Sequence, residues 1–426
     1  MEVEDKILPL TYDQRDIWLA AQINTKSSSA YKELIYLQFE GPLNVEFLNK
    51  SLQQVIQSHS SLRTIFHENG LYQTIKDPQE SKLKIYDISL ENENIREQLL
   101  KNWSKSFLEM ELRPESDSIF IPSLIKISAN NYILALAVHH IVADGYSVSL
   151  ILKDLSIFYN INAKLLPPIY NIPMQFWEFA EKEADLTKKI KEEAISYWKN
   201  ELKGPLPILE MPTDYMRPHV KSYAGEHYNF KIEKKLKNKL QEVGKNNNIT
   251  LFTTLLAAFK ILLSRYTGQN ELIIGVPCSK RDSEEDKTCV GHCTALLPIR
   301  TIQHDQISVI EFLKLVRSQL YNAIDNKFIN FNSLFHELGL IWDMSRSTPL
   351  IDVIFNMDSI TDPLEFDNLK SNIISINTPS SDLKGLEIEN ETSKFDLFMN
   401  ITGNANYLDV VIEFSTDLFS RNFIHS

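Results

Sequence analysis

The feature that most constrains the fold of this sequence is a run of seven apolar residues, 132–138, which reads YILALAV. A strand exposed on one face alternates apolar and polar residues, so an unbroken run of this length is typical of a strand buried on both faces. A more polar run, 139–147, follows it. After Ser147, which we expect to cap a helix, apolar residues form a helical stripe over 148–158.

Helices and strands interleave along the rest of the chain. Thr11 and Gln14 predict a capping box that starts a helix over 12–23. Further expected helices are 45–59, 175–202, 234–244 and 251–266, and expected strands are 33–40, 62–67, 71–76, 226–232, 271–277, 294–300, 350–357 and 407–415. Since there is no single βαβ rhythm, we predict a mixed α/β (α+β) chain. It should have two lobes of similar size joined by a proline-containing crossing at 160–174.

Composition narrows the classes of partner. The 426 residues carry 44 basic and 56 acidic side chains, a net charge of −12, without a Lys/Arg cluster. Nucleic acid and anionic membranes are therefore disfavoured as partners. The three cysteines define no disulfide framework, and the start of the chain has no signal-peptide pattern. The longest apolar stretch is interrupted by Lys260 and is too short to span a bilayer. We expect a soluble, cytoplasmic protein.

The polar run after the apolar strand carries the candidate chemistry: His139-His140, then Asp144-Gly145. Adjacent residues of a strand point to opposite faces, so one histidine would be structural and the other available for proton transfer. A purely structural pair and a metal site are the alternatives. The metal site would draw on Cys289, His292 and Cys293, but no third histidine stands at ligand spacing. Neither a G-x-S-x-G elbow nor a glycine-rich phosphate loop is present.

The pattern HHxxxDG resembles the signature of nonribosomal peptide synthetase condensation domains and their acyltransferase relatives. Other stretches resemble that family's motifs in the same order: 10–18, 59–66 (HSSLRTIF), 176–180, 211–218, 254–277, 290–300 (VGHCTALLPIR), 345–356, 394–397 and 416–419. The departures are Ser58 and Ser60 in place of the usual Arg and Glu, Ala295 in place of Asn, and Asn326 and Asn330 in place of His and Pro. The stretches 11–33 and 290–300 more narrowly resemble condensation domains that follow polyketide synthase modules, with a polyketide acyl donor.

This resemblance implies two chloramphenicol-acetyltransferase-like lobes, 1–170 and 171–426, that form a V with a tunnel between them. The C-terminal lobe would hold a floor loop (about 286–300) and a crossover segment (about 375–395). The implied site residues are His140 and Gly145 as catalytic, His139, Asp144, Arg281 and Arg300 as structural, and Arg63, Ser147, Ala295 and Asn356 as substrate or tunnel contacts, with no metal. Asp144 should be buried and paired with Arg281, or else with Arg300.

The implied activity is amide formation between a carrier-bound acyl or peptidyl thioester and a carrier-bound aminoacyl group. The implied partners are donor and acceptor carrier proteins and neighbouring adenylation or polyketide synthase modules, around a monomeric domain. No cofactor is expected on this domain, since the substrates arrive on phosphopantetheine arms. The rival functions are an ester-forming acyltransferase and a catalytically silent carrier-docking domain. Epimerisation domains fit less well, because Tyr146-Ser147-Val148 differs from the sequence that they usually have after the glycine. Heterocyclisation domains fit less well, because they have aspartates in place of the two histidines.

Overall fold

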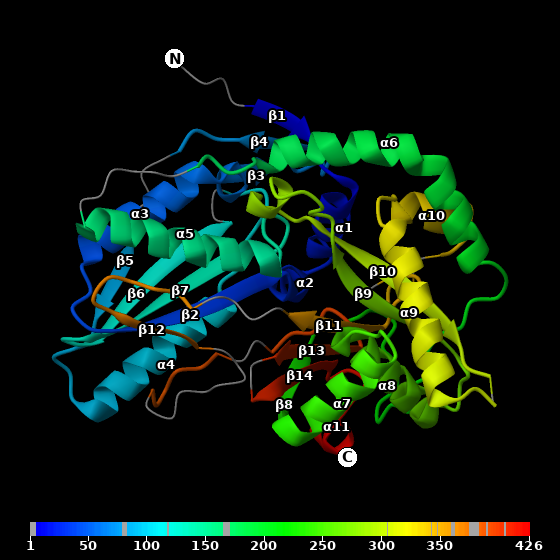
Figure 1. The fold of residues 1–426 in the computed structure, drawn as a ribbon. Helices are drawn as coiled ribbons and strands as arrows, with labels where there is room; N and C mark the ends of the chain where they lie inside the picture. The colour runs from blue at the N-terminus through cyan, green and yellow to red at the C-terminus, as the bar shows by residue number, and fades with distance from the viewer. Residues whose placement is uncertain are drawn as a thin grey trace. The chain divides into compact units, whose positions relative to one another are not determined.

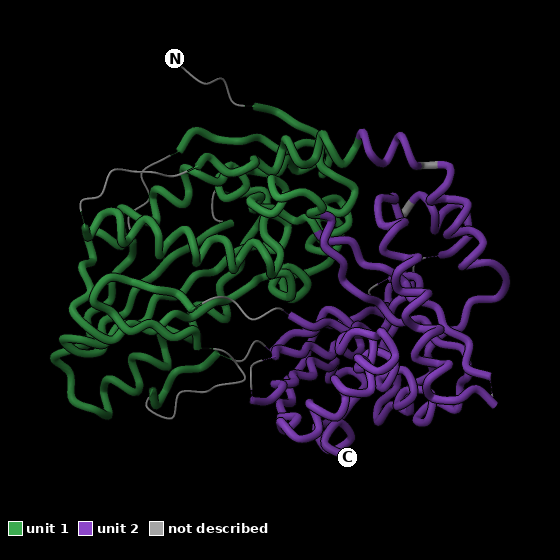
Figure 2. The backbone as a smooth tube through the Cα atoms, viewed as in Figure 1, with its two compact units in different colours: residues 1–184, 281–293, 361–390 green, residues 185–280, 294–360, 391–426 purple. Residues whose placement is uncertain are grey.

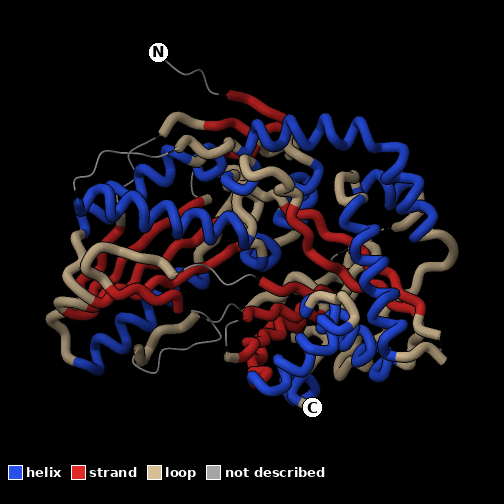
Figure 3. Tube along the Cα trace, viewed as in Figure 1, coloured by secondary structure: helices blue, strands red, loops and turns tan. Residues whose placement is uncertain are grey.

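The chain divides into two compact units, each of which combines sheets with helices (Figures 2 and 3). The computed structural model describes residues 6–78, 83–116, 119–164, 171–304, 306–341, 343–346, 348–358, 363–374, 383–388, 391–403 and 406–426. Unit 1 comprises 1–184, 281–293 and 361–390, and unit 2 comprises 185–280, 294–360 and 391–426. The predicted mixed α/β class is confirmed.

The two units do not have the bounds predicted for the two lobes, 1–170 and 171–426. Residue 170 itself lies outside the described residues. Segments 281–293 and 361–390, expected in the C-terminal lobe, belong to unit 1 by their contacts. Arg281 is paired with Asp144, and a strand in the second segment joins the sheet of unit 1. The expected floor loop is therefore divided between the units after residue 293. Of the expected crossover segment, 375–382 and 389–390 lie outside the described residues. The V and its tunnel stay predictions.

The main sheet of unit 1 has five strands in the order β12-β2-β7-β6-β5 (Figure 1). All neighbouring strands are antiparallel except β5 and β6. Their bounds are β2 Lys32–Glu40, β5 Lys84–Asp87, β6 Phe120–Ser128, β7 Asn131–His139 and β12 Lys370–Ile374. A second sheet, β1-β4-β3, is formed by β1 Lys6–Pro9, β3 Thr64–Phe66 and β4 Tyr72–Ile75.

Strand β7 is buried on both faces, as predicted. Ile133 and Ala135 share one core with Trp103 of α4, whereas Leu134 and Leu136 share another with residues of α3 and α5. Helices α3 and α5 lie side by side (Figure 1). The helices of unit 1 are α1 Tyr12–Ala21, α2 Thr25–Ala30, α3 Val45–Ser58, α4 Glu93–Glu109 and α5 Gly145–Lys164, with 3-10 turns at Ser60–Arg63 and Asp286–Thr288. The capping box of Thr11 and Gln14 is confirmed.

Unit 2 is built on one six-stranded sheet in the order β10-β9-β11-β13-β14-β8. Strand β11 is parallel to both of its neighbours, and the remaining pairs are antiparallel. The strands are β8 Gly225–Glu233, β9 Glu271–Ser279, β10 Thr294–Ile302, β11 Val353–Asp358, β13 Leu397–Gly403 and β14 Tyr407–Ser415. The helices are α7 Lys234–Asn246, α8 Leu251–Thr267, α9 Val309–Asp325, α10 Phe331–Glu337 and α11 Arg421–His425, and α6 Phe176–Glu201 runs from unit 1 into unit 2.

Among the described residues, no single helix is long and apolar enough to cross a membrane. Helices α7 and α8, bent by 105° at their junction, reach that length and composition only when they are taken together.

Lys260 of α8 is the most unusual residue in the core of unit 2, because its side chain is completely buried. Its Nζ donates hydrogen bonds to the carbonyl oxygen of Ile299, at 2.7 Å, and to Oγ1 of Thr301, at 3.2 Å. Burial lowers the pKa of Lys260 from 10.5 to about 7, because the charged form loses its hydration. The residue that interrupts the apolar stretch in the sequence thus ties the helix to strand β10.

Replacing Lys260 with Met should change how stability depends on pH. Between the folded pKa of about 7 and the usual 10.5, the unfolded chain binds more protons here than the folded chain. Stability contributed at this position therefore rises with pH across that window, by at most about 1.4 kcal/mol per pH unit. Urea titrations should show a shallower rise for Lys260→Met than for the parent. Lys239→Met, at an exposed lysine, is the control and should keep the parental dependence of stability on pH. If all three proteins show the same dependence, the pKa of Lys260 is not lowered by burial.

Candidate active site

The two adjacent histidines at the end of β7 diverge, as the strand geometry predicts. His139 is fully buried, and its Nδ1 accepts the backbone N–H of Ile141 at 3.2 Å. The side chain of His140 is 21% exposed, so it is the histidine that a substrate can reach. One histidine is therefore part of the core and the other is available for chemistry.

Backbone groups hold the ring of His140 in one orientation. The backbone N–H of His140 donates to the carbonyl oxygen of Tyr31 at 2.7 Å, and the ring Nδ1 lies 2.8 Å from the carbonyl oxygen of Ala143. Because a carbonyl oxygen only accepts, Nδ1 carries the proton of this bond, and when the ring is neutral Nε2 keeps its lone pair. Oε1 of Glu33 is 3.6 Å from Nδ1, and the ring of His292 lies edge-on with its centre 5.0 Å away. The ring is thus set up to accept a proton at Nε2.

Asp144 is buried and paired with Arg281, as predicted. Nη1 and Nη2 of Arg281 donate to the two carboxylate oxygens at 2.8 and 3.0 Å, a bidentate pair. The same carboxylate accepts the backbone N–H of Ser147 at 2.9 Å and that of Cys293 at 3.0 Å. Arg281 also donates to the carbonyl oxygens of Cys289 and Gly291. The pair therefore joins the turn after β7 to segment 281–293.

The charges of this pair stabilise each other. Burial alone would raise the pKa of Asp144, but the charge and hydrogen bonds of Arg281 and the hydroxyl of Ser147 hold it well below its usual range. Burial acts on Arg281 in the opposite sense, yet Asp144 keeps the pKa of that guanidinium above its usual value. Both groups stay charged, and Asp144 is unsuited to act as a proton donor or acceptor at neutral pH.

Ser147 does not cap helix α5 as expected. The helix begins two residues earlier, at Gly145. The side chain of Asp144 accepts the backbone N–H of Ser147, which is the hydrogen bond that an N-cap residue makes. The hydroxyl of Ser147 instead accepts the N–H of Gly291 at 3.1 Å and a bond from Arg281 at 2.9 Å. Ser147 is fully buried in this network, which gives it a structural role, and its contact with a substrate stays a prediction.

Gly145 is exposed at the first position of α5. A Cβ added there would meet no atom of the described chain within 4 Å, and its φ lies outside the left-handed region. Neither backbone conformation nor packing therefore requires a glycine at this position. Its N–H has no acceptor among the described residues, because the first N–H groups of a helix lack intrahelical partners.

The loop 289–293 approaches helix α6 closely. A Cβ on Gly291 would lie 2.0 Å from the ring of Phe176, so only glycine fits there without a shift. The sulfur atoms of Cys289 and Cys293 are buried and 4.0 Å apart. Within the described parts of the chain, no cluster of three His, Cys, Asp or Glu side chains is suited to a metal ion.

The other predicted site residues lie apart from this turn. Arg300 is in unit 2, where it pairs with Glu271 and donates to the carbonyl oxygens of Glu201 and Lys203; it is not a partner of Asp144. In the same unit, Ala295 is buried in the core, and Asn356 donates to Asp358 and Asn400.

Two of the departures from the family motifs cap helices. Asn326 ends α9, and its carbonyl oxygen accepts the indole N–H of Trp198 at 2.8 Å. Asn330 begins α10, where its side chain accepts the N–H of Ser333. Arg63, in unit 1, lines a separate cavity.

The comparisons with known proteins agree with this geometry. The sequence matches the family described as Condensation domain over residues 4–426. The chain belongs to the condensation domain family. It is 32% identical over 424 residues to one of the linear gramicidin synthase proteins of Brevibacillus parabrevis, a match that covers 99% of this chain and 8% of that protein. The chain thus spans less than a tenth of this curated relative.

Solved structures confirm the condensation domain fold with its two chloramphenicol-acetyltransferase-like lobes. The X-domain from teicoplanin biosynthesis has a TM-score of 0.84 at 21% identity, covering 100% of this chain and 92% of that one. The condensation domain of the monacolin K polyketide synthase has a TM-score of 0.82 at 16% identity, covering 99% and 95%. The enzyme class is that of this family, acyltransferase-type catalysts of amide bond formation.

Sequence reasoning missed the surroundings of the condensation domain histidine. Tyr31, Glu33 and Ala143 orient or face His140, and His292 lies edge-on to it, but the sequence patterns point to none of them in this role. Their signal in the sequence is weak, since two act through backbone carbonyls that any residue possesses. His292 lies inside VGHCTALLPIR and Ala143 inside HHxxxDG, but neither pattern marks the contact with the His140 ring.

Asp144→Ala should destabilise the protein as well as lower its activity. The mutation leaves the guanidinium of Arg281 buried without its carboxylate, and breaking a buried pair on one side costs about 3–5 kcal/mol. Urea titration measures this loss. Glu109→Ala, which removes an exposed ion pair with Lys105, is the control and should change stability by less than about 1 kcal/mol. An Asp144→Ala protein as stable as the parent, with only a catalytic defect, would show that the pair is not structural.

Proposed function

We propose that this domain joins a carrier-bound acyl or peptidyl thioester to a carrier-bound aminoacyl group and forms an amide. The observation that carries the proposal is the state of His140: Nδ1–H donates to the carbonyl of Ala143, and the ring is partly exposed at the end of β7. Membership of the condensation domain family supports the same reaction. The turn therefore offers a positioned proton acceptor at Nε2.

The reaction balances with one proton acceptor. The amine nitrogen attacks the thioester carbonyl carbon, a C–N bond forms, and the proton lost from nitrogen goes to Nε2 of His140. The C–S bond then breaks and the departing thiolate receives a proton, which restores the neutral ring. Since an α-amine has a pKa of about 8, an appreciable fraction is already neutral near pH 7. His140 therefore works mainly by orienting the amine and accepting the proton as the intermediate forms.

The start of helix α5 provides stabilisation for the oxyanion. The thioester oxygen becomes negative as the amine attacks, and donors aimed at it are worth about 3–4 kcal/mol in comparable sites. The N–H of Gly145 has no acceptor in the described chain and stands at the positive end of a 20-residue helix. The absence of a side chain there leaves room for a substrate carbonyl to approach.

The partners in this proposal are a donor and an acceptor carrier protein, with neighbouring adenylation or polyketide synthase modules. The domain binds no cofactor of its own, because the reactive groups arrive on phosphopantetheine arms. It works as a monomer in the cytoplasm, and no disulfide joins its three cysteines, which suits a reducing compartment. A polyketide acyl chain is the donor suggested by the stretches 11–33 and 290–300.

Mixing donor-loaded and acceptor-loaded carrier proteins with the domain tests the proposal by intact-protein mass. A new amide on the acceptor carrier supports it, and parallel reactions with polyketide and peptidyl donors identify the donor class. An ester formed with a hydroxyl acceptor, in place of an amide, identifies the ester-forming alternative. Carrier binding without any product identifies a docking domain.

His140→Ala should lower the rate of amide formation by about 10²–10⁴-fold, the usual loss when a general base is removed. The ring is partly exposed, so the variant should melt at nearly the parental temperature. Single-turnover rates with the native substrates measure the effect. A folded variant with a near-parental rate removes His140 from the mechanism.

Gly145→Leu should retain carrier docking but block amide formation. Within the described chain nothing lies within 4 Å of the added Cβ, so the folded protein accommodates the substitution and the obstruction falls on the substrate. Gly145→Ala is the matched, smaller change and should fold equally well with an intermediate loss. Carrier binding and turnover are measured on the same preparation. Persistent turnover in Gly145→Leu contradicts the placement of the reacting carbonyl beside this residue.

A further inference from the structure

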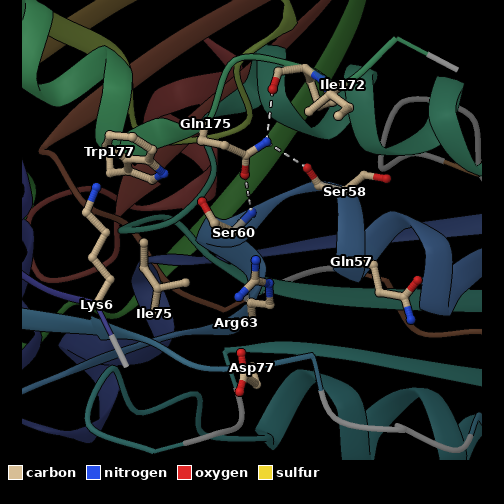
Figure 4. Close-up of a pocket in the computed structure, with 11 residues that line it drawn as sticks. Lys6, Gln57, Ser58, Ser60, Arg63, Ile75, Asp77, Ile172, Gln175 and Trp177 are labelled. Atoms are coloured by element: carbon tan, nitrogen blue, oxygen red, sulfur yellow. Dashed lines mark hydrogen bonds between the residues drawn. The ribbon is translucent and has the colours of Figure 1, made fainter. Parts of the chain in front are cut away.

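Unit 1 contains a second candidate site, a cavity of about 450 Å³. Its lining includes no residue of the histidine turn, residues 139–147. It lies where the strands β1 and β4, the end of α3 and the start of α6 come together (Figure 4). It is lined by Lys6, Gln57, Ser58, Ser60, Arg63, Ile75, Asp77, Ile172, Pro173, Gln175 and Trp177. This volume lies within the range of pockets that hold small organic molecules.

Arg63 brings unused hydrogen-bond donors to this cavity. Nη1 donates to the carbonyl oxygen of Lys76, but the buried Nε has no acceptor among the described residues. Asp77 points toward the guanidinium without a bond to it (Figure 4), and burial lowers the pKa of Arg63. Nη2 also has no acceptor among the described residues, so it is the guanidinium donor left for an anion in the cavity.

Ser60 adds a second unused donor in the wall of the cavity. The residue is 4% exposed, and its Oγ has no hydrogen-bond partner in the described parts of the chain. Gln175 holds the wall in place: its Oε1 accepts the N–H of Ser60 at 3.0 Å, and its Nε2 donates to the carbonyl oxygens of Ser58 and Pro173 (Figure 4). Ser58 and Ser60 are two of the departures noted in the sequence, and their small side chains leave the space open.

The remaining lining defines the kind of anion. Lys6, Arg63 and Asp77 together give the cavity a net charge of about +1 at neutral pH, which matches a monoanion better than a dianion. An apolar wall is formed by the ring of Trp177 and the side chains of Ile75 and Ile172. The ammonium group of Lys6 lies over the Trp177 ring. Such a wall favours a ligand with an aromatic or aliphatic part.

We propose that this cavity binds a small organic monocarboxylate, with the carboxylate on Arg63 and Ser60 and the apolar part against Trp177. The guanidinium fork suits a carboxylate because two parallel N–H···O bonds match its geometry. This site is separate from the proposed amide-forming reaction and does not depend on it.

Isothermal titration of the full chain with benzoate tests the proposal. We expect saturable binding of one benzoate per chain. Benzamide, which has the same shape but no charge, should bind at least about 10-fold more weakly, since charge-assisted hydrogen bonds are lost. Inorganic phosphate should also bind more weakly, because it has no apolar part and is largely dianionic. Benzamide binding as well as benzoate, phosphate binding more tightly, or no saturable benzoate binding each overturns the proposal.

Variants locate the site. Arg63→Gln should weaken benzoate binding by about 10- to 100-fold, and Arg63→Lys, which keeps the charge but loses the fork, should weaken it less. Ser60→Glu should abolish it, because its own carboxylate would occupy the cavity beside Arg63. Arg113→Gln, at an exposed arginine elsewhere in unit 1, is the control and should bind like the parent. Parental benzoate affinity in folded Arg63→Gln or Ser60→Glu protein places the ligand elsewhere and refutes the assignment.

Discussion

The buried pair of Asp144 and Arg281 is the interaction on which the candidate active site depends. Its two side chains are 3% and 1% exposed, and each carboxylate oxygen accepts bonds from both the guanidinium and a backbone N–H. Taking two charges out of water is costly, so such a pair persists only when its hydrogen bonds are satisfied. Here they are satisfied by segments more than one hundred residues apart in sequence. The pair thus fixes the loop 289–293 against the start of helix α5.

This connection fixes the turn that carries His140 although the turn is a loop. Asp144 caps α5 with the same carboxylate that binds Arg281, so the helix start and the ion pair share one group. Ala143, the preceding residue, holds Nδ1 of His140 through its carbonyl oxygen. The position of the reactive ring therefore follows from the ion pair through a single residue. Loss of Asp144 should disturb helix, loop and histidine together.

Unit 1 thus carries two chemically different regions. The turn 139–147 has a histidine ring that can accept a proton and, at Gly145, a helix N–H without an acceptor among the described residues, which suits the proposed amide formation. The cavity around Arg63 has donors without an acceptor among the described residues, which suits the binding of an anion. Phe176 and Trp177 lie next to each other at the start of α6; the first packs against Gly291, and the second lines the cavity. The two regions therefore have neighbouring residues of one helix in their walls.

The sequence by itself determined the buried strand before the histidines, their divergence to opposite faces and the capping box of Thr11, and it indicated Arg281 as the first candidate partner of Asp144. Periodicity, capping patterns and an ordered set of motifs are local or recognisable in sequence, so they could be read directly. Only the tertiary structure decided that 281–293 and 361–390 pack with the N-terminal part, that Arg300 pairs elsewhere, and that Gly145 is needed for neither turn nor packing. It also decided the tautomer of His140 and the unused donors of Arg63 and Ser60. These depend on backbone carbonyls, open space and missing partners, none of which has a side-chain pattern in the sequence.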